Sequence, residues 1–175
     1  MSFIRRFLGV GPATPNSKDP DSVQVIAARL EALPPDRARY LAAYAYVLAR
    51  VAYADEDLHP EELNRIGTVL AERGGLGEDQ ASLVADLASS ESADRGGTQD
   101  YVVTRLLARI ATKEQRVEIL DGLLAVAAAD GTIEVSEEDE VRQIARQLGF
   151  HDSQYLDALA HYRDLRSVLR GMPGS

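Results

Sequence analysis

Apolar residues recur at helical spacing along most of the chain after residue 21. The pattern i, i+3, i+4, i+7 is typical of a helix that turns one face toward a core. Strictly alternating runs, which would indicate strands, are missing. The sequence therefore predicts an all-α fold of about eight helices. The apolar stripes that define them lie within 23–30, 41–52, 63–70, 83–88, 103–110, 117–127, 141–148 and 156–169.

Prolines, glycines and polar stretches set the expected helix ends. Pro34-Pro35 separates the first helix from a long second one, expected from about Asp36 to Ala54. The fourth helix is expected to end before the polar stretch 92–98, and the last one to continue through Leu169 to Gly171.

A shift of 75 residues superposes the two halves of the chain. Asp55 then falls on Asp130 and Glu62 on Glu137, with apolar positions matching on both sides. Such self-similarity predicts an internal duplication, with two pseudo-symmetric four-helix halves at about 22–92 and 98–170 within one domain, 22–170. Chance agreement between short Ala/Leu-rich helices is the alternative, but it does not explain why the loop carboxylates coincide.

Residues 1–21 differ from the rest in composition. Three prolines with Gly, Ser, Asn and Asp between them predict a flexible N-terminal segment. It starts with a short amphipathic stretch, residues 1–9, where Arg5 and Arg6 accompany four large apolar side chains. One interpretation is a weak peripheral membrane anchor or docking peptide. The other is a loose end, because two helical turns are marginally stable alone.

Composition narrows the function further. The 175 residues include 19 Lys and Arg against 28 Asp and Glu, a net charge of −9, which argues against nucleic acid as a partner. Cysteine is absent, so thiol nucleophiles, disulfides and thiolate metal sites are excluded. No apolar run approaches the roughly 20 residues that span a bilayer, and no secretory signal is visible. We therefore expect a cytoplasmic protein, with a peripheral position at the inner face of the membrane as the alternative.

Two acidic loops, residues 54–66 and 129–141, carry the most distinctive chemistry. Each follows a helix rich in small residues and leads into a helix rich in glutamate. Glutamates at a helix N-terminus interact favourably with the helix dipole, so most of the acidic residues in these loops have a structural explanation. Asp55 and Asp130 are different, because a carboxylate at a helix C-terminus is mildly unfavourable. They indicate either an Asx-type turn or a ligand for a cation.

The repeated Asp-x6-Glu spacing makes Asp55, Glu62, Asp130 and Glu137 the candidate metal ligands. Carboxylate oxygens suit hard divalent cations, and calcium, magnesium, manganese or zinc is the expected cofactor if one binds. An EF-hand is excluded, because neither loop has the glycine at position six or the glutamate at position twelve.

Other candidate residues have simpler interpretations. His59 could add an imidazole ligand, but a role as a turn or N-cap residue is favoured. Ser136 with Asp139, or Glu134 before Val135, could begin the helix after the second loop. Tyr40 and Tyr44 share a helical face and are expected to pack in the core or an interface.

The stretch Ala-Asp-Gly-Thr-Ile at 129–133, Glu137, and the helix 141–150 resemble the TerB-like tellurite-resistance family. The pattern recurs more weakly around Asp55 and Glu62, with Glu56 in place of the glycine, and covers about 36–165. The same domain type occurs at the front of some membrane-anchored DnaJ-like cochaperones. No J-domain is present here, and His59-Pro60-Glu61 is not the His-Pro-Asp signature.

The resemblance implies an all-helical, acidic module that binds a divalent cation in stress-response complexes. Its implied ligands are Asp55, Glu62, Asp130 and Glu137. We therefore expect a non-enzymatic stress-response module that binds a cation, a protein partner, or both. A second hypothesis is an adaptor recruited to a membrane or protein assembly through residues 1–9, with no metal site.

Overall fold

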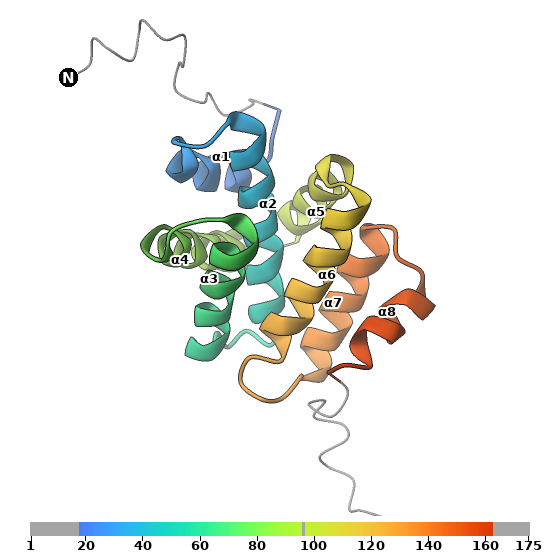
Figure 1. Cartoon of the computed structure of the whole chain (residues 1–175). Coiled ribbons are helices and arrows are strands. Elements are labelled where there is room, and N and C mark those ends of the chain that lie inside the picture. Colours follow the sequence, from blue (N-terminus) through green and yellow to red (C-terminus); the bar gives the residue numbers. More distant parts are fainter. Residues whose placement is uncertain (1–17, 96, 163–175) are drawn as a thin grey trace, which may run out of the picture.

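The computed structural model describes residues 18–95 and 97–162, and these ranges form a helical fold without strands (Figure 1). The prediction of an all-α protein with about eight helices is confirmed. The elements are α1 (Asp21–Ala27), the 3-10 helix η1 (Ala28–Leu30), α2 (Pro35–Ala52), α3 (Pro60–Gly74), α4 (Glu78–Arg95), α5 (Thr98–Ile110), α6 (Lys113–Ala127), α7 (Val135–Gln147) and α8 (Asp152–Leu159).

Helix α2 forms the centre of the fold. It packs against α1, α3 and α4 on one side and against α5, α6 and α7 on the other (Figure 1). Every residue from Tyr40 to Ala52 is buried. A helix that is apolar on all sides is stable only when it is surrounded, and this segment is apolar apart from Arg50. The N-terminal and C-terminal helices therefore share one core built around α2.

The charged end of α2 is tied to α5 and α7 through Arg50. Its guanidinium donates to the Asp100 carbonyl at 3.1 Å and to the Thr104 hydroxyl at 2.5 Å, and it pairs with the Glu140 carboxylate. Tyr46 adds a hydrogen bond to the Asp100 carboxylate at 2.8 Å. A buried charge needs such partners, so this network fixes the position of the second half relative to α2.

Helices α2 and α6 approach closely at a glycine. The Tyr44 hydroxyl donates to the Glu118 carbonyl at 3.3 Å, and a Cβ atom at Gly122 would lie only 2.2 Å from the Tyr44 oxygen. The Tyr40 and Tyr44 rings lie 6.0 Å apart between centroids. The expected packing role of these two tyrosines is confirmed.

Some expected boundaries were wrong. Helix α4 continues through Ser92 to Arg95 instead of ending before the polar stretch, because Ser89 and Ser92 are buried and α4 packs along α2. Here tertiary packing overrides the weak helix preference of serine. Helix α8 ends at Leu159, and Leu165 to Leu169 lie outside the described residues.

The N-terminal part of the described chain is attached to the fold. Asp19, inside the stretch expected to be flexible, is buried and pairs with Arg39 on α2. The amphipathic stretch 1–9 lies outside the described residues. Within 18–95 and 97–162, no helix combines the length and hydropathy needed to cross a membrane.

Candidate functional site

The two acidic loops fold in the same way. After α2, the Asp55 Oδ1 atom accepts the backbone N–H of Asp57 at 2.9 Å. After α6, the Asp130 Oδ1 atom accepts the backbone N–H of Thr132 at 2.8 Å and its hydroxyl at 3.0 Å. Both are Asx turns, in which a carboxylate caps the backbone two residues on. The turn interpretation of Asp55 and Asp130 is thus confirmed, and it commits one oxygen of each carboxylate.

A residue in the left-handed region follows each aspartate. Gly131 has φ +92°, which glycine adopts without strain, whereas Glu56 at the equivalent place has φ +66°. Within the described ranges, Glu56 is the one non-glycine residue with positive φ. The first loop therefore keeps the turn of the second without the residue best suited to it.

Replacing Glu56 with glycine is expected to stabilise the protein by about 1 kcal/mol. The substitution removes the steric cost of a left-handed side chain, and the greater freedom of glycine in the unfolded chain offsets part of that gain. Urea denaturation measures it. The matched change Gly131→Ala should lower stability by a similar amount, and a loss of stability in Glu56→Gly would contradict the proposed strain.

Each loop ends in a helix whose third residue is a glutamate that caps the helix start. The Glu62 Oε2 atom accepts the backbone N–H of His59 at 3.0 Å, and Glu137 Oε2 accepts that of Glu134 at 2.7 Å. His59 is the N-cap of α3, as favoured from the sequence. Glu134 is the N-cap of α7, so the alternative start at Ser136 was wrong.

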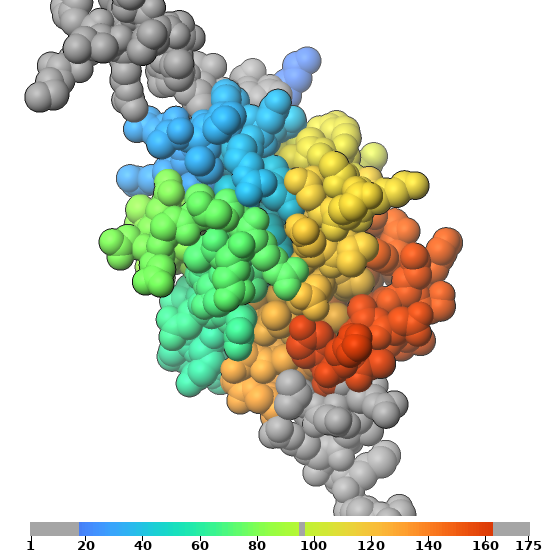
Figure 2. Space-filling view, viewed as in Figure 1, coloured from blue at the N-terminus to red at the C-terminus, as the bar shows by residue number. Residues whose placement is uncertain are grey.

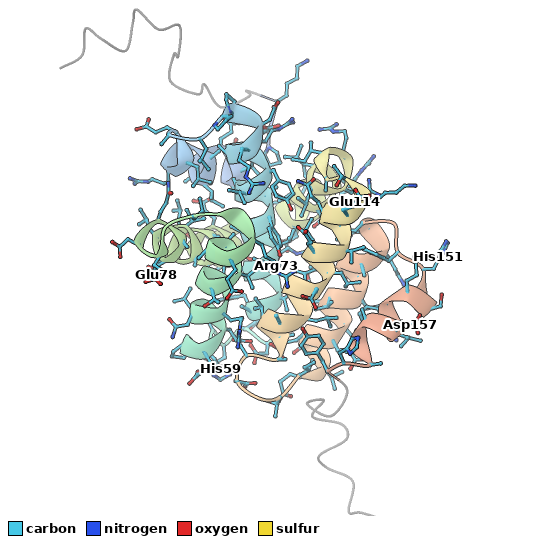
Figure 3. All side chains as sticks on the ribbon, in the orientation of Figure 1. His59, Arg73, Glu78, Glu114, His151 and Asp157 are labelled. Atoms are coloured by element: carbon cyan, nitrogen blue, oxygen red, sulfur yellow. The ribbon has the colours of Figure 1, made fainter. Side chains whose placement is uncertain are left out.

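The two capping glutamates meet in the interior. The N-termini of α3 and α7 lie at the same end of the molecule (Figure 1), the end where His59 is labelled in Figure 3. The side chains of Glu62 and Glu137 are hydrogen-bonded to each other. Glu62 is 2% exposed and Glu137 is 4% exposed. Two acidic residues, 75 positions apart and from different halves, thus form one buried carboxyl pair.

Burial is the main cause of the raised pKa values of Glu62 and Glu137. It raises the pKa of both carboxyl groups, because a charged carboxylate loses its hydration there. For Glu137, the hydrogen bond to Glu62 and the negative charges of Glu62 and Asp130 raise the pKa further. Two neighbouring carboxylates cannot both stay charged at a buried site unless a cation is bound between them. The pair must therefore hold either a shared proton or a cation.

Asp55 and Asp130 lie close enough to the two glutamates to influence their charge, but the four side chains do not form a group of metal ligands. Asp55 raises the pKa of Glu62 through its charge, as Asp130 does for Glu137. The Asp55 Oδ2 atom is also 4.0 Å from His59 Nε2. Among the residues that the structure describes, no three His, Asp or Glu side chains are grouped closely enough to hold a metal ion. Of the four candidate ligands, only the two glutamates are brought into direct contact.

The sequence did not reveal which of the four carboxylates would meet. The 75-residue offset predicted that Glu62 and Glu137 are equivalent, but equivalent positions can lie at opposite ends of a fold. The contact depends on how α3 and α7 pack around α2, which is a tertiary property.

The family comparison agrees with this architecture. The family model of tellurite resistance protein TerB matches residues 41–160, which is more than half of the chain and includes both acidic loops. No curated protein and no solved structure matches the chain significantly. An all-helical fold and a family match that spans α2 to α8 lead to one conclusion: the chain belongs to the TerB family.

Proposed function

We propose that this protein is a non-enzymatic TerB-like stress-response module that binds a divalent cation between its two halves. Glu62 and Glu137 would be the direct ligands, and Asp55 and Asp130 would strengthen the site through their charge or through bridging water. The observation that carries the proposal is the buried contact between the two glutamates. A cation there would neutralise two charges that otherwise repel each other.

The donor atoms suit a hard cation. The Oε2 atom of each glutamate accepts a backbone N–H, so the Oε1 atom would be the one to coordinate the cation. Asp55 and Asp130 use Oδ1 for their turns, which leaves Oδ2 in each. Calcium, magnesium and manganese prefer such oxygens and accept water in the remaining positions. Zinc would need nitrogen from His59, the nearest imidazole, which already faces Asp55.

The same argument explains why a proton competes with the cation. A protonated Glu137 can donate to Glu62, and this bond must break before both carboxylates bind metal. Cation binding should therefore release a proton and tighten as the pH rises. A purely structural carboxyl pair would hold its proton with every ion present.

Isothermal titration calorimetry of the full chain with calcium, magnesium, manganese and zinc tests the proposal. At least one ion should give heat with a 1:1 stoichiometry, and the heat should vary with buffer ionisation enthalpy as protons are released. Glu137→Gln should abolish binding or weaken it at least tenfold. Glu61→Gln, an equal charge change at an exposed neighbouring position, should leave it intact. No heat from any ion at millimolar concentration would remove the cation from the proposed function.

A protein partner is the second part of the proposal. Exposed carboxylates surround the pair on the same loops, among them Asp57, Glu61 and Glu134. A surface of this charge favours a basic partner and excludes an acidic one. A cation bound beneath it would reduce the local negative potential, so partner affinity should depend on the ion.

A further inference from the structure

A groove of about 530 Å³ runs between α3 and α4, and neither glutamate of the carboxyl pair lines it. Three α3 residues spaced four apart, Leu63, Gly67 and Ala71, form its apolar floor, and the lining also includes the polar side chains of Asn64, Thr68 and Ser82. A Cβ atom at Gly67 would lie 3.9 Å from the Ser82 backbone, so small residues let the two helices approach closely here. The result is a shallow apolar trough about 12 Å long, since each helical residue advances 1.5 Å.

The rim of this groove is acidic. Glu78 and Asp86 line it from α4, and Glu72 lines it from the end of α3. All three side chains are exposed, and no Lys, Arg or His is among the lining residues. Figure 3 labels Glu78 at the start of α4, on the side of the molecule where α1 packs. An apolar floor with a negative rim fits a cationic amphipathic segment.

The chain itself contains such a segment. Residues 1–9 combine the apolar Phe3, Ile4, Phe7 and Leu8 with Arg5 and Arg6 and contain no acidic residue. They precede α1, which packs against α4, and Gln80 on α4 reaches the Arg29 carbonyl at 3.5 Å. The described chain begins where Asp19 pairs with Arg39 on α2 and Ser22 bonds to Gln99 on α5, so residues 1–9 are tethered to the fold through α1, a neighbour of α4.

A short connection tethers residues 1–9 to the described chain. Residues 10–17 join the segment to the described chain, and eight residues can span up to about 27 Å. The effective concentration of a tethered segment is high, on the order of millimolar for a short linker, so even weak docking would be populated.

We propose that residues 1–9 dock into the α3–α4 groove of the same chain, with the apolar side chains on Leu63, Gly67 and Ala71 and the two arginines against the acidic rim. This site is separate from the proposed cation site and does not depend on it. Docking covers the apolar floor of the groove and withholds the N-terminal segment from other surfaces.

The absence of cysteine makes a direct test straightforward. A spin label on Ser2→Cys in the full chain is the only thiol label, and its proximity broadens nearby amide signals in nuclear magnetic resonance spectra. We expect at least twofold intensity loss for residues 63–71 and 78–86, with residues on α7 and α8 unaffected. Figure 2 shows α3 and part of α4 exposed next to each other on the face in view.

A charge-matched pair of variants provides the control. Asp86→Lys at the groove rim should restore the broadened signals, whereas Asp157→Lys at an exposed position on α8 should not. Broadening that is absent, or that occurs away from α3 and α4, overturns the proposal. So does broadening that transfers to isotope-labelled chains without a spin label, which indicates a second copy. Segment binding only to anionic vesicles, with no effect on the groove, would indicate a membrane anchor instead.

Discussion

Replacement of Arg50 with methionine is expected to lower the free energy of unfolding by about 3 kcal/mol or more. Methionine keeps much of the side-chain volume on α2 but removes the hydrogen bonds of the guanidinium to Asp100, Thr104 and Glu140. Removing one partner from a buried charged network typically costs about 3–5 kcal/mol, because the remaining charge is left without compensation. Partial exposure of the Glu140 side chain, 23%, places the expected value toward the lower end. Urea denaturation monitored by circular dichroism measures the change.

The exposed ion pair between Arg146 and Asp152 is the control. Both side chains are more than half exposed, so Arg146→Met should leave the denaturation midpoint close to that of the wild type. Equal effects of the two substitutions would show that the Arg50 network contributes no more than a surface pair. Arg50→Lys should fall between them, because lysine keeps the charge but not the forked geometry.

Substitution of Glu137 by glutamine should make the metal-free protein more stable at pH 8, by about 1–3 kcal/mol. Each pH unit over which the native state holds one extra proton costs about 1.4 kcal/mol of stability. Glutamine still accepts the Glu134 N–H and can donate to Glu62, so it replaces the protonated carboxyl without titrating. The helix start is preserved while the repulsion is removed.

The sign of the pH dependence follows from the raised pKa of Glu137. Burial raises the native pKa above the value of about 4.5 that holds in the unfolded chain. The native state therefore binds more protons above that pH, and the stability of the wild type should fall as the pH rises from 5 to 8. Denaturation midpoints in the presence of a chelator, measured across this range, should show a shallower slope for Glu137→Gln. The exposed control Glu61→Gln should retain the wild-type slope.

Addition of a cation that binds the pair should make the wild type more stable than Glu137→Gln. At pH 8 a cation that neutralises the pair stabilises the wild type by mass action but has little to bind in Glu137→Gln. A variant that is less stable than the wild type at pH 8 without metal would contradict the shared-proton interpretation of the pair.

Local chemistry was readable from the sequence because it depends on neighbours in the chain. The Asx turns at Asp55 and Asp130 and the N-cap role of His59 follow from side chains that bond to backbone groups two or three residues away. The end of α4 was not readable in this way. Ser89 and Ser92 favour a helix end by local preference, but their burial continues the helix.

For the candidate site too, local features were predicted from the sequence and tertiary contacts were not. The sequence indicated four carboxylates at equivalent places in two loops, and the family resemblance implied that they bind a cation. The match over residues 41–160 confirms the family. The sequence did not indicate that Glu62 and Glu137 are in contact. Nor did it indicate that Asp55 and Asp130 are too far from them to form a group of three or more metal ligands. Nor did it show that Arg50 would be buried among groups from three helices.

The sequence by itself determined the helical class, the family and the chemistry of the two loops, because periodicity and capping are properties of short segments. Only the tertiary structure decided that two glutamates 75 residues apart share one buried position. That contact arises because α2, apolar on all sides, must be surrounded by both halves, and this brings the starts of α3 and α7 together.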